Sequence, residues 1–472
     1  MFGLMCFPAA YQCFISYFAF TTPLWKCKEN STTCLLNGTH PTTDKRICLY
    51  QPTEWEYTES RAFSIVSQFD LYCDKEWLIE MTTSTLFIGW FFGSILIGWW
   101  SDNYGRRKAI FVSIASTIFF GLLSSVMPNI YSFIACRFFI GCFLPGTFQQ
   151  IMFLYISEIV GDDRRAFAGL SMFFFVNISL LVLALKAYFI RQWRLLYIVS
   201  TVPFAFVVGF YRYVPESVRF LRVQGKTDEA MSIFRMIADR NRTEIPDGVS
   251  IEPHAMTTKT NSSTPLDLFR TPKLCVVSII QAVTYFAGAM SFYSLYLGAA
   301  NISGNMFRDY LFITAIEVPV AIMMMDFTER FGRKRTVMAT MFIGSLMCVP
   351  LGFIPNRGDM KIARLIFGMI GKVSISAHCN CIQSWSVELY PTKIRGVAMG
   401  FLLLVARLGA ASAAFVNKEF SKCHEGGVYI FIGATLFILL FMLCFLPEMK
   451  GVPISDGDSM EESESSSLAE EC

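Results

Sequence analysis

Charge is scarce in this sequence. Of its 472 residues only 16% are charged, whereas 54% are apolar, and the mean hydropathy is +0.46. A soluble protein rarely has such a composition, and runs of about 20 apolar residues, long enough to cross a bilayer as helices, recur along the chain. The basic residues gather in short loops between these runs, which is typical of cytoplasmic loops and not of a nucleic-acid-binding surface. The sequence therefore predicts an all-α polytopic membrane protein.

Motifs for chemistry on phosphates or acyl groups are also missing. The sequence has no Walker loop, so ATP-driven pumping has no support, and no Ser/His/Asp constellation indicates an enzyme. The segment from His378 to Cys381 contains metal-ligating residue types, but residues two apart point to different faces of a helix. We expect no metal site, no cofactor and no enzymatic activity.

Lysine and arginine are absent before Lys26, so the first apolar segment, residues 2–22, lacks the usual basic anchor. A cleaved signal peptide is one interpretation of this segment. The basic n-region of a signal peptide is missing, however, and the apolar stretch is long for its h-region. We expect a transmembrane helix whose cytoplasmic lead-in is truncated.

The chain repeats itself once. Residues 98–108 return in looser form as residues 325–335, and Asp102 lies 227 residues before Glu329. Further pairs at nearly this separation are Arg137 and Arg364, Glu158 and Glu388, and Glu216 and Glu448. One internal repeat in a membrane protein indicates two helix bundles related by pseudo-symmetry, with a transport path between them.

Twelve candidate spans fall into two sets of six, which places both chain ends in the cytoplasm. The predicted divisions are a first transmembrane helix (1–22), an extracellular loop (23–77), the rest of the N-terminal bundle (78–213), a cytoplasmic loop (214–272), a C-terminal six-helix bundle (273–446) and an acidic, Ser-rich tail (447–472). Within the cytoplasmic loop, the apolar spacing of residues 217–240 predicts one amphipathic helix on the inner membrane face. We expect the tail to be disordered.

The loop after the first span has the marks of an oxidising, extracellular environment. It contains two glycosylation sequons, at Asn30 and Asn37, and four cysteines. The disulfide candidates are Cys27, Cys34, Cys48 and Cys73. Three pairings of these cysteines are possible, and spacing does not choose among them.

The repeated hinge suggests a gate. We expect Gly98 to let a neighbouring helix approach closely, and acids and bases near the span ends to form an ionic lattice on the cytoplasmic side. Its predicted members in the first half are Asp102, Arg106, Arg107, Glu158, Arg165 and Glu216, and in the second half Glu329, Arg333, Glu388, Arg395 and Glu448. Such a lattice can hold one conformation closed and break when the halves rock. Anchoring of basic loops at the membrane is the simpler alternative.

The hinge resembles the signature of the major facilitator superfamily. Within that superfamily, the chain resembles the solute carriers for organic cations, anions and zwitterions such as carnitine. The matching parts are the long cysteine-bearing first loop and residues 64–73, 192–194, 215–221, 267–272 and 388–395. The resemblance covers nearly the whole chain. It implies the major facilitator fold, with twelve helices in two six-helix bundles, and transport of amphipathic organic ions. The family's short cytoplasmic lead-in before the first span is absent from this sequence.

Charges within spans are costly unless they face a cavity or a partner, so they mark candidate substrate sites. Glu317 matches an acidic-x-Pro pattern of the family, and Arg407 stands where the anion and carnitine branches carry Arg and the cation carriers an acid. The anion branch also has a Lys at the position of Ala321, which weakens a purely anionic assignment. Helix pairing is the alternative for both charges.

Aromatic side chains complete the predicted substrate site, because they suit amphipathic ions through stacking and cation–π contact. The candidates are Tyr285, Phe292, Tyr293 and Trp385. Phe292 and Tyr293 align with an aromatic pair that lines the family's cavity. Ordinary packing explains any single aromatic residue equally well.

Together these features predict a secondary active or facilitative transporter that works by alternating access. We expect it in the plasma membrane, with a small organic anion or zwitterion as substrate. Its other expected partners are the lipid bilayer and a possible coupling ion, whose identity is unknown, and no nucleic acid. The alternatives are an organic cation transporter, a sugar-porter-like carrier, and a non-transporting receptor on the same fold. A sugar porter has a short first loop and does not require Arg407.

Overall fold

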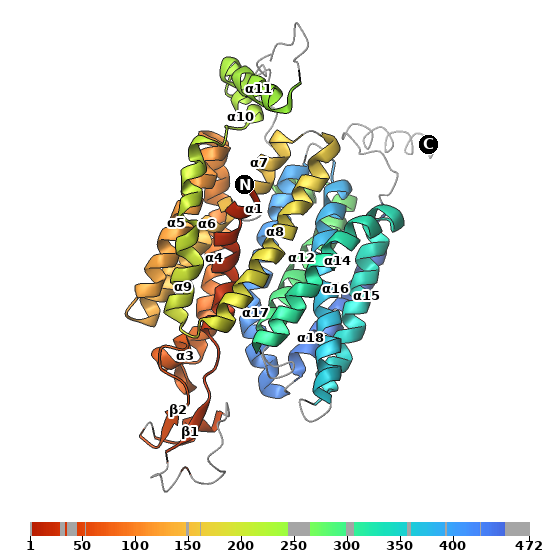
Figure 1. The fold of residues 1–472 in the computed structure, drawn as a ribbon. Coiled ribbons are helices and arrows are strands. Elements are labelled where there is room, and N and C mark those ends of the chain that lie inside the picture. Colours follow the sequence, from red (N-terminus) through yellow and green to blue (C-terminus); the bar gives the residue numbers. More distant parts are fainter. Residues whose placement is uncertain are drawn as a thin grey trace. The chain divides into compact units, whose positions relative to one another are not determined.

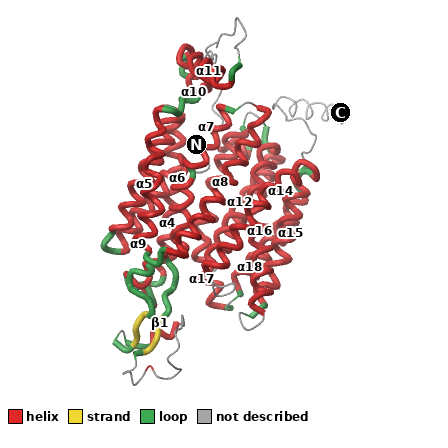
Figure 2. The backbone as a smooth tube through the Cα atoms, in the orientation of Figure 1, coloured by secondary structure: helices red, strands yellow, loops and turns green. Residues whose placement is uncertain are grey.

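The computed structural model describes residues 2–28, 34, 45–51, 53–147, 151–160, 162–243, 265–298, 306–355, 360–391, 394–424 and 426–448. Contacts divide the chain into two units, Met1–Met256 and Thr257–Cys472. Long helices make up most of both units, and within the described part of the chain the only strands are one short pair in the first unit (Figures 1 and 2).

The first unit contains α1 (Phe2–Met5), α2 (Phe7–Ala19), β1 (Trp25–Cys27), η2 (Lys45–Leu49), β2 (Trp55–Tyr57), α3 (Ile65–Gln68), η3 (Cys73–Lys75), α4 (Trp77–Tyr104), α5 (Arg106–Val126), α6 (Ile130–Thr147), α7 (Ile151–Ile159), α8 (Asp162–Phe189), α9 (Trp193–Thr201), η4 (Val202–Arg212), α10 (Val218–Val223) and α11 (Thr227–Asn241). The second contains η5 (Pro265–Phe269), α12 (Pro272–Gly298), α14 (Met306–Phe331), α15 (Arg333–Phe353), α16 (Met360–Leu389), α17 (Arg395–Cys423) and α18 (Gly427–Cys444).

Ten helical segments of the described chain are long and apolar enough to cross a membrane. They coincide with ten of the twelve predicted spans. At the position of the first span, the helix is interrupted at Cys6 between α1 and α2. At the position of the fifth span lies α8, whose apolar part is Phe174–Phe189. Helices therefore stand at all twelve predicted positions, six in each unit, and the chain is an all-α polytopic membrane protein.

Glycines let α4 and α6 pack with their backbones in contact. A Cβ atom on Gly93 would lie 2.1 Å from the carbonyl oxygen of Cys142, and one on Gly141 would lie 2.1 Å from that of Leu86. Small residues allow such close approach where lipid supplies no hydrophobic driving force. We predicted this role for Gly98, but among the described residues no atom outside its own helical turn lies within 4 Å of a Cβ there, so no neighbouring helix of the described chain approaches it closely.

A buried arginine braces each unit at matching positions of the repeat. Arg137 on α6 is 0% exposed and donates hydrogen bonds to the Gln12 carbonyl oxygen (2.6 Å) and to Ser16 Oγ (2.5 Å) on α2. Arg364 on α16 donates to the carbonyl oxygen of Ile354, at the end of α15 (2.5 Å). Arg137 thereby joins α6 to the middle of α2, and Arg364 joins α16 to the end of α15.

The loop between α2 and α4 folds around its own small core. Strands β1 and β2 pair antiparallel, with Trp25 opposite Tyr57, and Trp25 and Trp55 pack with Cys34 and Ile47. Two disulfides, Cys27–Cys34 and Cys48–Cys73, close this loop. In Figure 1 this loop lies at one end of the first unit's helices, whereas α10 and α11 lie at the other end.

The segment predicted as one amphipathic helix is two helices. α10 ends at Val223 and α11 begins at Thr227, and between them Gly225 has a φ of 73°. Glycine adopts this left-handed conformation without a steric cost, so it ends the first helix and turns the chain. The helical spacing of apolar residues continued across the break and concealed it.

Candidate functional site

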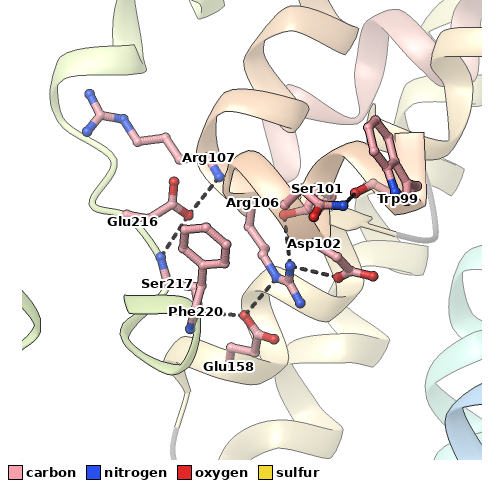
Figure 3. A network of polar contacts seen from close by, with 10 residues as sticks. Trp99, Ser101, Asp102, Arg106, Arg107, Glu158, Glu216, Ser217 and Phe220 are labelled. Carbon is pink, nitrogen blue, oxygen red and sulfur yellow. Dashed lines mark hydrogen bonds and ion pairs between the residues drawn. The ribbon is translucent and has the colours of Figure 1, made fainter. Parts of the chain in front are cut away.

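The polar hinge lies where α4 ends and α5 begins (Figure 3). Gly105 has a φ of 108°, and a Cβ there would lie 2.4 Å from Glu216 Oε2. Because Gly105 has no side chain, the Glu216 carboxylate reaches the start of α5, where it accepts the backbone N–H of Arg107 (3.0 Å). It also accepts the N–H of Ser217 (3.0 Å). A carboxylate at a helix N-terminus satisfies N–H groups that lack an intrahelical partner and is favoured by the helix dipole. Glu216 therefore caps α5 from a distant part of the sequence.

Arg106 is the centre of the ion-pair network beside this cap. It lies 2.8 Å from Asp102 Oδ1 and 3.6 Å from Glu158 Oε2, and it donates to the Ser101 carbonyl oxygen (2.8 Å). Glu158 Oε2 also accepts the hydroxyl of Ser217 (2.5 Å). The Glu158 side chain is 6% exposed and that of Asp102 is 66% exposed, so the two carboxylates differ sharply in solvent screening. The network joins α4, α5, α7 and the start of α10 (Figure 3).

Several predicted members of this lattice have other roles. The Glu216 carboxylate accepts backbone N–H groups, and the Arg107 guanidinium lies over the ring of Tyr211, 4.0 Å from its centroid. The side chain of Arg165 lies outside the described part of the structure. Sequence reasoning missed Ser217, which links Glu158 to α10 and accepts the N–H of Phe220 as N-cap. A serine just before an amphipathic helix was the available signal.

The second unit repeats this geometry. Gly332 has a φ of 93°, and a Cβ there would lie 3.0 Å from Glu448 Oε2. Glu448 Oε1 accepts the backbone N–H groups of Arg333 (3.2 Å) and Lys334 (3.4 Å) at the start of α15. The Arg333 side chain forms an ion pair with Glu388, 2.9 Å long. The internal repeat thus specifies a glycine, a capping carboxylate and an arginine–glutamate pair in each unit.

Two further lattice predictions meet different outcomes. Arg395 donates from Nε and Nη2 to the carbonyl oxygen of Tyr390 (3.3 and 3.2 Å), which holds the turn before α17, and it also interacts electrostatically with Glu388. The side chain of Glu329 lies outside the described part of the structure. Lys334, which sequence reasoning missed, donates to the carbonyl oxygens of Cys444 (2.9 Å) and Leu446 (2.5 Å), at the end of α18. A cation suits this place because the last carbonyls of a helix carry partial negative charge.

An ion pair lies deep in the second unit. Lys372 on α16 is 3.0 Å from Glu317 Oε1 on α14, and the two side chains are 1% and 5% exposed. Ser376 donates to the same carboxylate oxygen (2.5 Å), and the hydroxyl of Tyr296 on α12 donates to Glu317 Oε2 (3.0 Å). The carboxylate therefore has three partners from α12 and α16. Sequence reasoning found Glu317 but missed Lys372, although a lysine near the middle of an apolar segment was a sufficient signal.

Aromatic rings surround the ammonium group of this pair. Lys372 Nζ lies 3.7 Å from the ring centroid of Phe292 and 3.7 Å from that of Tyr296. Tyr293 stacks edge-on against Phe292, with centroids 5.1 Å apart. Of the predicted aromatic residues, Phe292 is thus placed against the charged pair. Tyr296 was not singled out from the sequence, although it lies one helical turn after Phe292.

The remaining predicted substrate residues lie elsewhere in the second unit. Tyr285 on α12 is buried and donates its hydroxyl to Ser386 on α16 (3.1 Å), and the adjacent Trp385 is 0% exposed. These contacts join two helices. Arg407 is 7% exposed and lies near the middle of α17.

Two other sets of predictions concern the surface and metals. Asn30 and Asn37 lie outside the described residues. Among the described residues, no group of three or more His, Cys, Asp or Glu side chains is placed to hold a metal ion. His378 is 1% exposed on α16, and its neighbour Cys379 is half-buried.

Comparison with known proteins agrees with these features. The family of sugar (and other) transporters matches residues 2–460. Organic cation transporter 1 of Caenorhabditis elegans is 31% identical, covering 85% of this chain and 69% of that protein. Human solute carrier family 22 member 13 is 28% identical (85% and 72% covered). Human organic cation/carnitine transporter 2 is 27% identical (85% and 72% covered).

Among solved structures, the inward-open conformation of the Escherichia coli xylose transporter XylE is similar in fold. Its TM-score is 0.67 at 16% identity, with 97% of this chain and 98% of that chain covered. These matches agree with the two-unit helical architecture and with the hinge of glycine and carboxylate that occurs in each unit. The chain belongs to the major facilitator superfamily, as a multi-pass membrane transporter of the solute carrier family that includes the organic cation and carnitine transporters.

Proposed function

We propose that this protein carries small organic anions or zwitterions across the plasma membrane by alternating access. The observation that supports this is the net charge of the side chains near the middle of the second unit's helices. Of the side chains near the middle of its described helices, three are charged: Glu317, Lys372 and Arg407. One acid and two bases leave a net charge of +1, whatever contacts each side chain makes. A positive interior of low dielectric attracts anions and repels simple cations.

Arg407 is the proposed contact for the substrate's negative group. A guanidinium stays protonated and binds carboxylate or sulfate through two parallel hydrogen bonds. Glu317 is the proposed contact for the positive end of a zwitterion. In this structure it is paired with Lys372, so a zwitterion would have to take the place of that ammonium.

The hinges of the two units are the proposed gate. Each contains an arginine–glutamate contact beside a capped helix, Arg106 with Glu158 and Arg333 with Glu388. Such polar contacts are rigid when made and break as a unit, which suits a switch between two conformations. The same contacts would also serve as fixed braces.

Uptake into proteoliposomes tests the substrate class. A panel of radiolabelled ions of similar size would contain a carboxylate, a carnitine-like zwitterion and a quaternary ammonium, with empty liposomes as control. We expect saturable uptake of the anion or the zwitterion and little of the cation. Preferential uptake of the quaternary ammonium would refute the charge assignment, and binding without uptake of any ion would favour the receptor alternative.

A further inference from the structure

The ammonium group of Lys372 lies in surroundings that proteins use to bind organic cations. Two aromatic rings lie 3.7 Å from its nitrogen, and a carboxylate oxygen lies at 3.0 Å. The hydroxyl of Ser376 lies at 2.9 Å. Aromatic faces attract ammonium groups through their quadrupoles, and they do so best when water is excluded. Here Lys372 is 1% exposed, so the chain itself fills this site.

The rings and the carboxylate belong together as one cage. Phe292 and Tyr296 lie on α12 with their centroids 4.9 Å apart, and the Tyr296 hydroxyl holds the second oxygen of Glu317. Glu317 comes from α14 and Lys372 from α16, so three helices meet at the ammonium. We call the Phe292, Tyr296, Ser376 and Glu317 side chains the ammonium cage. A simple ion pair for helix packing needs the carboxylate but not two ring faces against the nitrogen.

We infer that the ammonium cage is a binding site for primary alkylammonium groups, which Lys372 occupies as a tethered ligand, and that Lys372 thereby sets the carrier against cationic substrates. The discrimination against cationic substrates rests on the proposed function, whereas the binding site for ammonium groups does not. The tethered lysine competes with any free ammonium at an effective concentration far above that of a solute, because it needs no association step. It also contributes one of the two positive charges near the middle of the second unit's helices.

A variant that lacks the lysine side chain and leaves its space empty tests whether the cage binds a free ammonium ion. Lys372→Ala deletes a propylammonium group, so n-propylammonium is the probe, and n-propanol is the uncharged control of the same length. Lys372→Met is the matched variant: it loses the same charge but still fills the cage with an apolar chain. Because Lys372→Ala leaves a buried carboxylate unpaired and is expected to fold less well, Lys372→Ala/Glu317→Gln provides a variant without that charge.

Thermal unfolding and equilibrium binding of purified protein in detergent are the measurements. We expect n-propylammonium, but not n-propanol, to raise the unfolding midpoint of Lys372→Ala and to bind it at least about tenfold more tightly than the wild type or Lys372→Met. The double variant should fold with weaker binding of the probe, because the rings remain and the carboxylate is gone. Equal affinity for Lys372→Ala and Lys372→Met would overturn the inference, since charge alone would then explain the gain. Absence of saturable binding to a folded Lys372→Ala would also overturn it.

Uptake separates this inference from the proposed function. In proteoliposomes, Lys372→Ala should take up an organic ammonium ion that the wild type rejects, whereas Lys372→Met should not. If the wild type transports no organic ion while the probe still binds Lys372→Ala, the cage is correct and the proposed function fails. If the wild type transports anions or zwitterions but Lys372→Ala gains no binding of the probe, the proposed function stands and the cage is wrong.

Discussion

Within the first hinge, two carboxylates lie near the same arginine, and their burial predicts different contributions to stability. Glu158 and Asp102 both lie near Arg106, but their side chains are 6% and 66% exposed. An exposed ion pair contributes about 0–1 kcal/mol, because water screens it. A buried charged group that accepts hydrogen bonds contributes about 1.5–3 kcal/mol, and losing it leaves a partner unsatisfied. We therefore expect Glu158→Gln to destabilise the hinge by on the order of 2 kcal/mol more than Asp102→Asn.

Unfolding of the two variants in detergent measures this difference in stability. A gap of about 2 kcal/mol corresponds to roughly a 30-fold change in an equilibrium constant. Glu158→Gln should clearly lower the unfolding midpoint, and Asp102→Asn should barely do so. A double-mutant cycle with Ser217→Ala isolates the hydroxyl contact of Glu158, whose coupling should be about 1 kcal/mol. If Asp102→Asn destabilises as much as Glu158→Gln, the reasoning from burial is wrong.

The same variants test the gate. Asp102→Asn should slow conformational exchange at near-normal surface abundance, and substrate binding should survive better than turnover because the proposed substrate site lies on other helices. Glu158→Gln should change turnover more, since its contacts join more elements. Unchanged turnover per surface molecule in both variants would count against a gate and favour a fixed brace.

Three further predictions address the loop and the substrate site. Glycosidase should shift the gel mobility of the protein from eukaryotic cells, and Asn30→Gln with Asn37→Gln should abolish the shift; a shift that persists would place the glycans elsewhere. Cys48→Ser with Cys73→Ser should lower the stability of the loop by about 3 kcal/mol, because this disulfide closes a 25-residue separation, and limited proteolysis would detect the loosened loop. Arg407→Asp should strongly reduce anion or zwitterion uptake per surface molecule and admit cations, whereas Arg407→Lys should keep part of the uptake; an unchanged ion preference in Arg407→Asp would refute its role as selector.

The sequence by itself determined the fold class and the repeat. Apolar length specifies a spanning helix almost alone, because a helix is the only open-chain element that satisfies its backbone groups within lipid. Short motifs also determined where the hinges lie, since Gly105 and Gly332 need a conformation that other residues avoid. The break at Gly225 was missed because the apolar residues on both sides of it follow one helical spacing, and that spacing does not reveal a glycine that ends a helix.

Only the tertiary structure decided which side chains meet. The sequence places Glu216 and Glu448 near basic residues, but whether a carboxylate pairs with a guanidinium or caps a helix depends on positions in space. Here both carboxylates cap helices. Likewise, Glu317 was recognisable as a costly buried charge, whereas its partner Lys372 lies 55 residues away on another helix. Periodicity describes one helix at a time. A contact between helices depends on their rotation and depth, which packing determines and no local pattern encodes.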